Sequence, residues 1–282
     1  MRKRMGAAFM AMAMVCAGVT ACSSGASAPA ATKAESKAEA KADLGEQSIL
    51  VAAAASLKNA YEDELIPMFE EQYPGVTVEG TYDSSGKLQT QIEEGLEADV
   101  FMSAATKQMK ALDEEGVIAS DTIVNLLENK IVLIVPTGSD SKIDSFEKIG
   151  DAASIALGDP ESVPAGQYAK EALTNLNVWD SIQDKVSFGT NVTEVLNQVA
   201  AASADAGIVY ATDAQTENTN GDDKEVEIVA TAEDSMMQTP VIYPVGTVSS
   251  SAHKDEAKAF EDFLQTDEAK AILAKAGFTI NK

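Results

Sequence analysis

Four short segments place small or hydroxyl-bearing residues between the end of an apolar run and the start of a helical pattern. Ser56 follows the first such run and Ser85 the second, while Ala165 and Val192 take the same position further along the chain. The first amides of a helix have no intrahelical acceptor, and the helix dipole is positive at that end. Four such helix starts that met in one place would therefore bind an anion.

The elements that must position these residues follow from the apolar periodicity. From Ser48 onward short apolar runs alternate with amphipathic stretches, which predicts an α/β fold with largely parallel strands. Strands are expected at residues 49–54, 76–79, 98–102, 131–135, 155–157, 186–188, 207–210, 226–230 and 241–248. Helices are expected at residues 57–73, around Leu88 and Ile92, around Met109 and Leu112, at 165–176 and 192–202, and twice before the C-terminus. In an open α/β sheet ligands bind at the carboxyl edge of the strands, where these helix starts lie.

Two successive series of strands and helices predict two lobes. We expect residues 48–130 together with 235–282 to form lobe 1 and residues 131–234 to form lobe 2, with a ligand cleft between the lobes. About 235 residues is large for one core but suits two.

The N-terminal segment predicts export and a lipid anchor. Residues 1–21 combine Arg2, Lys3 and Arg4 with a short apolar stretch, as in a bacterial signal peptide. Val-Thr-Ala-Cys at 19–22 resembles a lipobox, which implies a lipid on Cys22, cleavage just before it, and an extracytoplasmic protein held at the cell membrane. Residues 22–47 are rich in Ala, Ser, Lys and Glu, so we interpret them as a flexible tether, with a surface helix as the alternative.

The charge balance limits the partners. The chain has 21 basic and 45 acidic residues; without Arg2, Lys3 and Arg4 the exported part has 18 against 45, a formal charge of −27. Such a surface repels nucleic acid and anionic lipid. No arginine follows Arg4, so any bound anion must be held by amides, hydroxyls or lysine rather than by a guanidinium group. A ring of donors with few acceptors disfavours a protonated ligand, which favours molybdate, tungstate or sulfate over hydrogen phosphate.

Seven ordered motifs resemble the periplasmic molybdate-binding family of ABC importers. They lie at residues 53–57, 82–88, 98–104, 158–166, 207–210, 243–245 and 277–280, and the Gly-Asp-Pro-Glu-Ser-Val-Pro-Ala-Gly stretch at 158–166 is the most specific. The resemblance implies a two-lobed periplasmic-binding-protein-like fold, delivery of molybdate, and of tungstate too, to an importer permease, and a monomer. It also implies the oxyanion ligands Ser56, Ser85, Ala165, Val192 and Tyr210, with no direct protein ligand to the metal atom and no resident cofactor. Tyr210 enters only through this resemblance.

Two positions depart from the family pattern. Asp83 stands where a smaller residue is common, and its carboxylate would repel an anion unless it turned outward. Gly86 replaces a frequent serine, which removes one possible donor. Both departures bear on affinity more than on function.

Other interpretations stay open at this point. Serines at helix starts are often only N-caps. A sulfate or other oxyanion binder, a surface interaction lipoprotein and a serine hydrolase are alternatives, the last because Ser84 and Lys87 match the S-x-x-K pattern, as do Ser145 with Lys148 and Ser251 with Lys254. We expect no catalytic residues, because no stronger catalytic motif is present. Asp159 and Glu161 are a weak candidate for a metal site.

Overall fold

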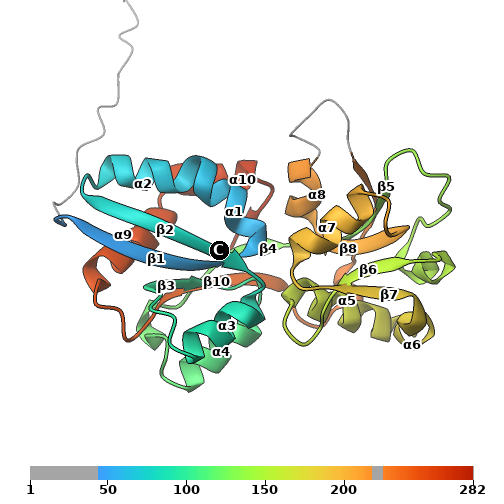
Figure 1. Cartoon of the computed structure of the whole chain (residues 1–282), viewed down its shortest axis with the longest axis horizontal. Coiled ribbons are helices and arrows are strands. Elements are labelled where there is room, and N and C mark those ends of the chain that lie inside the picture. The colour runs from blue at the N-terminus through green and yellow to red at the C-terminus, as the bar shows by residue number, and fades with distance from the viewer. Residues whose placement is uncertain (1–43, 218–224, 282) are drawn as a thin grey trace, which may run out of the picture. The chain divides into compact units, whose positions relative to one another are not determined.

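The computed structural model describes residues 44–217 and 225–281 (Figure 1). The predicted signal peptide, Cys22 and most of the predicted tether lie outside these residues. Within the two described ranges, no helix is both long enough and apolar enough to cross a membrane.

The first sheet has six strands and draws on both ends of the described chain. Its strands, in spatial order, are β11 (Thr279–Ile280), β4 (Val124–Asn129), β10 (Val241–Thr247), β3 (Val100–Met102), β1 (Gln47–Ala54) and β2 (Val76–Asp83). β4 and the short β11 are absent from the sequence-based prediction. Val124–Asn129 ends in polar residues and has only two fully buried members, so it lacks the apolar run that marks the other strands.

The second sheet has five strands, all from the middle of the chain. Its strands, in spatial order, are β7 (Val186–Gly189), β6 (Ile155–Gly158), β8 (Ala206–Tyr210), β5 (Ile131–Pro136) and β9 (Val226–Thr231). The chain passes from the first sheet to the second between β4 and β5, and returns between β9 and β10. The protein is thus a two-lobed α/β protein with one sheet in each lobe.

Both sheets are mixed, so the prediction of largely parallel strands was wrong. β1 is parallel to β2 and β3, and β6 is parallel to β7 and β8, but β10 and β5 are antiparallel to their neighbours. β5 and β10 are each the first strand after a passage between the sheets, and the short β11 is also antiparallel to its neighbour β4. The start of β5, Ile131, pairs with the end of β8, Tyr210, because the chain enters the second sheet at the edge where the parallel strands end.

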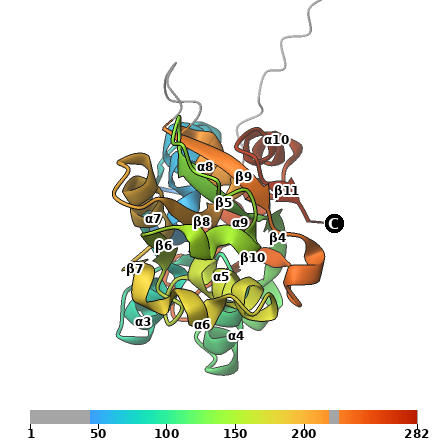
Figure 2. The same cartoon turned by 90° about the vertical axis from the view of Figure 1, so that its right-hand side faces the viewer.

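Helices cover both faces of each sheet. The helices are α1 (Lys58–Ala60), α2 (Ile66–Gln72), α3 (Ser85–Glu93), α4 (Thr106–Glu114), α5 (Pro164–Asn175), α6 (Trp179–Ile182), α7 (Val192–Ala200), α8 (Ala211–Glu217), α9 (Lys254–Leu264) and α10 (Asp267–Lys275). A π-helical turn, Tyr61–Leu65, joins α1 to α2, and 3-10 turns lie at Ala55–Leu57, Ser120–Thr122, Phe146–Asp151, Gln183–Lys185 and Asp234–Met236. In Figure 1, α2 lies on one face of the first sheet and α3 and α4 lie on the other. Figures 1 and 2 both place α5 and α7 on opposite faces of the second sheet.

The alternation along β1 divides the core of lobe 1. Val51 and Ala53 pack with the cluster that contains Phe69 and Phe260, whereas Ala52 packs with Leu88 and its neighbours from α3 and α4. Side chains of successive strand residues point to opposite faces, so one fully buried strand supports both helix layers. The end of β1 is therefore packed on both of its faces. It pairs with the end of β2, Ala54 beside Asp83, which brings the two helix starts of this lobe together.

Candidate functional site

The start of α3 presents Ser85 as the first residue of a helix that follows β2. Its side chain is fully buried, and its Oγ accepts a hydrogen bond from the amide of Ala104 at 2.9 Å. This bond uses a lone pair of the hydroxyl and leaves its proton free to be donated. The backbone amide of Ser85 lies in the first turn, where no intrahelical acceptor exists.

Ser56 lies in the turn after β1 and is oriented by a chain of hydrogen bonds. Its Oγ is 2.9 Å from the Oη of Tyr243, and that Oη accepts from the Nδ2 of Asn129 at 3.3 Å. The Asn129 amide is fixed in turn, because its Oδ1 accepts from the Lys130 amide at 2.8 Å. Tyr243 can then donate its own proton to Ser56, which leaves the Ser56 proton for a ligand.

The start of α5 requires a close approach of two backbones. Pro164 occupies the first turn of the helix, so Ala165 supplies the first N–H group, and Ala165 is fully buried. A Cβ atom on Gly166 would lie 2.0 Å from the carbonyl oxygen of Gly158 at the end of β6. Glycine is therefore required for α5 to begin directly against the sheet.

The start of α7 is capped by a side chain that leaves its first amide uncommitted. The Oδ1 of Asn191 accepts from the amide of Glu194 at 2.9 Å, and the carboxylate of Glu194 accepts from the amide of Thr190 at 2.7 Å. The Thr190 hydrogen bond lowers the pKa of Glu194. Val192, the first residue of the helix, is 4 % exposed, and its amide has no intrahelical acceptor.

Tyr210 ends β8 and is fully buried. Its Oη lies 3.5 Å from the carbonyl oxygen of Ala104, and its ring contacts that of Tyr243 edge-on at 5.6 Å. Burial raises the pKa of Tyr210 well above its usual value, so the hydroxyl keeps its proton and can donate it.

All five predicted ligand residues line one small cavity. Its volume is about 200 Å³ including its opening to solvent, and its lining consists of Ala54, Ala55, Ser56, Asp83, Ser84, Ser85, Ala104, Val163, Pro164, Ala165, Val192 and Tyr210. Seven of these residues come from lobe 1 and five from lobe 2. Asp83 is the one charged residue in this lining, and no cation contributes to it.

The two lobes touch around this cavity. The amide of Gly86 donates to the carbonyl oxygen of Ser162 at 2.9 Å, and Gln108 donates to Gln167 at 3.3 Å. A Cβ atom on Gly86 would lie 2.4 Å from the Ser162 carbonyl oxygen. Gly86 lacks the hydroxyl that a serine would offer here, but its small size permits a direct backbone hydrogen bond between the lobes.

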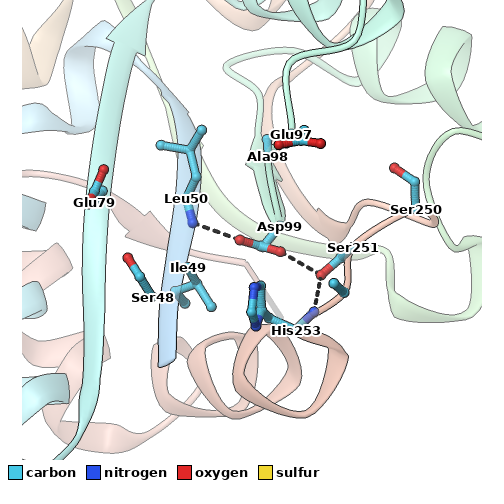
Figure 3. A pocket seen from close by; sticks show the side chains of 11 residues that line it. Ser48, Ile49, Leu50, Glu79, Glu97, Ala98, Asp99, Ser250, Ser251 and His253 are labelled. Atoms are coloured by element: carbon cyan, nitrogen blue, oxygen red, sulfur yellow. Dashed lines mark hydrogen bonds between the residues drawn. The ribbon is translucent and has the colours of Figure 1, made fainter. Parts of the chain in front are cut away.

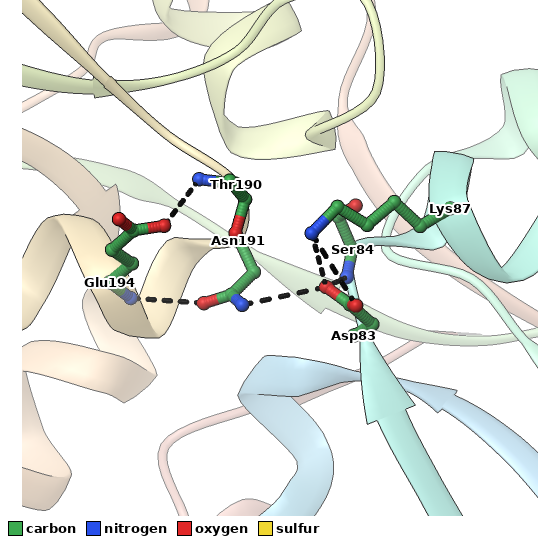
Figure 4. Close-up of polar contacts among 6 residues, drawn as sticks. All are labelled: Asp83, Ser84, Lys87, Thr190, Asn191 and Glu194. Carbon is green, nitrogen blue, oxygen red and sulfur yellow. Dashed lines mark hydrogen bonds and ion pairs between the residues drawn. The ribbon is translucent and has the colours of Figure 1, made fainter.

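Asp83 lines the cavity, but its charge is partly compensated. Figure 4 shows its carboxylate between the two lobes. Its Oδ1 accepts from the Ser84 amide at 2.7 Å, from Lys87 at 3.3 Å and from the Nδ2 of Asn191 at 3.4 Å. These three donors occupy the oxygen that would otherwise repel an anion, and the Asn191 bond joins lobe 2 to lobe 1.

Comparison with known proteins fits this arrangement. Residues 49–279 match the family described as bacterial extracellular solute-binding protein. The chain belongs to this family. Over 232 residues it is 42% identical to the "Putative ABC transporter substrate-binding lipoprotein YvgL" of Bacillus subtilis, covering 82% of this chain and 86% of YvgL. It is 39% identical to the molybdate-binding protein ModA of Escherichia coli over 242 residues, covering 83% and 90% of the two chains.

A solved structure supports the same membership. The substrate-binding domain titled as that of a "putative molybdenum ABC transporter" from Clostridium difficile aligns with a TM-score of 0.63 and 37% identity, covering 84% of this chain and 100% of that domain. The predicted family and the predicted two-lobed fold of a periplasmic binding protein are both confirmed. The solute-binding protein acts outside the cytoplasm, as members of this extracellular family do.

A second hollow of the solute-binding protein lies away from the cleft, beside Asp99 and His253 (Figure 3). Asp99 is buried, and its two oxygens accept from the Leu50 amide at 2.7 Å and from the Ser251 hydroxyl at 2.6 Å. The Ser251 oxygen accepts from the His253 amide at 3.0 Å. These bonds attach the turn before α9 to β1, so the carboxylate serves the fold.

In the serine hydrolase alternative, Ser84 would need Lys87 as its base, but the two side chains are not hydrogen-bonded. Lys87 pairs with Asp83, and the Ser84 hydroxyl has no hydrogen-bond partner among the described residues. A nucleophilic serine needs a base within hydrogen-bond reach.

No group of three or more His, Cys, Asp or Glu side chains suited to a metal ion occurs in the part of the chain that the structure describes.

Three residues at the site were not identified from the sequence. Tyr243 and Asn129 orient Ser56, and the Asn191 side chain links the lobes. Asn191 carries a local signal, because an asparagine before a helical pattern is a common N-cap. Tyr243 belongs to the motif at 243–245, but neither it nor Asn129 has a local pattern that indicates contact with Ser56, since their partners lie far away in the sequence.

Proposed function

We propose that this solute-binding protein captures molybdate outside the cytoplasm and delivers it to the permease of an ABC importer. The observation that carries the proposal is the single cavity lined by Ser56, Ser85, Ala165, Val192 and Tyr210, with uncharged donors from both lobes. The names of the similar proteins, which include molybdate-binding proteins of several bacteria, agree with it.

The donors suit a tetrahedral dianion. Ser56 and Ser85 each combine a hydroxyl with a first-turn amide, Ala165 and Val192 supply amides, and Tyr210 supplies a protonated hydroxyl. Hydrogen bonds to a charged group contribute about 1.5–3 kcal/mol each, so several such bonds replace the water shell without arginine. The Ser85 oxygen accepts from the Ala104 amide, and we expect Tyr243 to donate to Ser56, so both serine hydroxyls would donate to the anion. A protonated anion would find few acceptors, and tungstate, with the same charge and shape, is expected to bind as well.

Binding would proceed by closure. In an open form each lobe offers half of the donors, and a bound anion joins the halves. The Gly86 and Asn191 contacts across the cleft then stabilise the closed form, which the permease recognises. No step in this cycle makes or breaks a covalent bond, so we propose no catalytic activity.

We further propose that a lipid on Cys22 holds the exported protein, as a monomer, at the cell membrane. The lipobox-like residues before Cys22 and the lipoprotein name of YvgL support this. Mass spectrometry of the mature N-terminus would detect the lipid. A Cys22→Ala variant should leave the membrane fraction, and an unmodified Cys22 would contradict the proposal.

Calorimetry with molybdate, tungstate, sulfate and phosphate tests the ligand. We expect molybdate and tungstate to bind most tightly, and Ser56→Ala and Ser85→Ala to weaken molybdate binding by about 1–3 kcal/mol each. Ser251→Ala, outside the cavity, is the control and should leave affinity unchanged. Tighter binding of sulfate would favour the sulfate alternative, and no heat with any of the four anions would contradict the function.

A further inference from the structure

Ser84 occupies the N-cap position of α3 without capping the helix. Its backbone has the extended conformation of an N-cap, φ −62° and ψ 142°, but its side chain accepts no hydrogen bond from the first turn. An N-cap serine normally accepts from the second or third amide of the helix. Here the second amide, that of Gly86, donates across the cleft to Ser162 instead.

The Ser84 hydroxyl is buried and unpaired. The residue is 4 % exposed, and its Oγ has no hydrogen-bond partner among the described residues. Buried hydroxyl groups in folded proteins almost always have a partner, so an unpaired one needs an explanation. Ser84 lines the same cavity as Ser56, Ser85 and Tyr210.

The neighbouring charged groups do not supply the partner. Asp83 accepts from the amide of Ser84, not from its hydroxyl, and Lys87 pairs with Asp83 (Figure 4). Ser85, by contrast, has its oxygen held by the Ala104 amide. Of the two adjacent serines, Ser84 is therefore the one whose full hydrogen-bonding capacity is left for the contents of the cavity.

We propose that the Ser84 hydroxyl is a further ligand of the oxyanion, to which it donates its proton. This inference rests on the proposed function. It adds a donor that the family resemblance does not assign, and it accounts for the unused cap. Two hydroxyls and the amide of Ser85 would then reach the anion from the start of α3 alone.

Calorimetric titration of the purified protein with sodium molybdate, combined with thermal melting without ligand, tests the role of Ser84. We expect Ser84→Ala to raise the Kd about tenfold. Its melting temperature without ligand should equal or exceed that of the wild type, because no protein hydrogen bond is lost. Ser84→Thr, which keeps the hydroxyl, should retain most of the affinity.

Ser251→Ala is the matched control, since Ser251 is also buried just before a helix but has two protein partners. It should lower the melting temperature and leave the Kd unchanged. Wild-type affinity in Ser84→Ala, or a loss of melting temperature as large as in Ser251→Ala, would overturn the inference while the proposed function stands. A wild type that binds no oxyanion would overturn both.

Discussion

The cleft cavity and the hollow beside Asp99 both lie at helix starts that carry serine, yet they differ in what remains unpaired. Beside Asp99, the carboxylate oxygens and the Ser251 hydroxyl are all engaged within the protein. In the cleft, the Ser84 hydroxyl has no partner among the described residues, and the Ser85 oxygen accepts from Ala104 while its proton stays free. The Ser56 hydroxyl has a single side-chain hydrogen bond, to Tyr243. Polar residues that satisfy one another stabilise the fold, whereas polar residues left with free donors mark the place where a ligand completes the structure.

If the larger hollow were assumed to be the ligand site, the hollow beside Asp99 would be chosen over the cleft. The hollow beside Asp99 holds about 740 Å³ including its mouth, against about 200 Å³ in the cleft. The lining of the larger hollow includes Glu79, Glu97 and Asp99, whose carboxylates disfavour a bound anion. The two hollows therefore differ in the charge of their linings and in how many hydrogen-bond donors are left unpaired, and on these grounds we assign the proposed anion site to the cleft.

The largest expected effect is that of Asp99→Ala, which tests whether Asp99 stabilises the fold without affecting the cleft. The variant loses two hydrogen bonds to a charged group, each worth about 1.5–3 kcal/mol, so we expect the free energy of unfolding to fall by about 3 kcal/mol or more. Molybdate affinity, measured well below the melting temperature, should not change. A large loss of affinity in a folded Asp99→Ala protein would mean that the two hollows are coupled.

Gly86→Ala tests the contact between the lobes. The added Cβ would lie 2.4 Å from the Ser162 carbonyl oxygen, so the closed form must shift. We expect molybdate binding to weaken by about 1–3 kcal/mol, with little change in melting without ligand. Gly150→Ala, whose Cβ would meet its nearest atom at 3.6 Å, is the control. Equal affinities in the two variants would remove Gly86 from the closure mechanism.

Tyr243→Phe tests whether Ser56 must be oriented by Tyr243 to bind molybdate. Removal of the phenolic oxygen breaks the chain from Asn129, so Ser56 loses the partner that orients it. We expect a loss of molybdate affinity of about 1 kcal/mol by calorimetry. Tyr61→Phe removes a buried hydroxyl that contacts the sulfur of Met102, and should leave affinity unchanged. Unchanged affinity in Tyr243→Phe would show that Ser56 needs no such support.

The smallest expected effect is a pH dependence of stability that comes from Glu261, which lines neither the cleft cavity nor the hollow beside Asp99. Burial raises the pKa of Glu261 from 4.5 to about 7, although the Thr247 hydroxyl donates to it. Folding therefore favours the protonated acid, and its contribution to stability is lost as the pH rises from 4.5 to about 7. Glu261→Gln should melt progressively higher than the wild type between about pH 5 and about pH 8. A difference in melting temperature that does not vary with pH would contradict the raised pKa.

Local sequence determined most of the elements and the chemistry of the proposed ligand set. Apolar runs such as residues 131–135 predicted buried strands, and the serines and small residues at Ser56, Ser85 and Ala165 marked helix starts. The absence of arginine after Arg4 already limited anion recognition to neutral donors and lysine. These properties depend on residues within a few positions of one another.

The tertiary structure decided what distant residues do together. Strand β4 forms because β10 and β11 pair with it, and β5 and β10 reverse because the chain enters each sheet from the edge facing the other lobe. The contact of Ser56 with Tyr243 spans 187 residues, and the Gly86 amide, which Ser84 could otherwise cap, donates to Ser162 of the other lobe. A hydrogen bond between distant segments has no periodicity along the chain, so only the folded arrangement reveals which donors are used and which remain for a ligand.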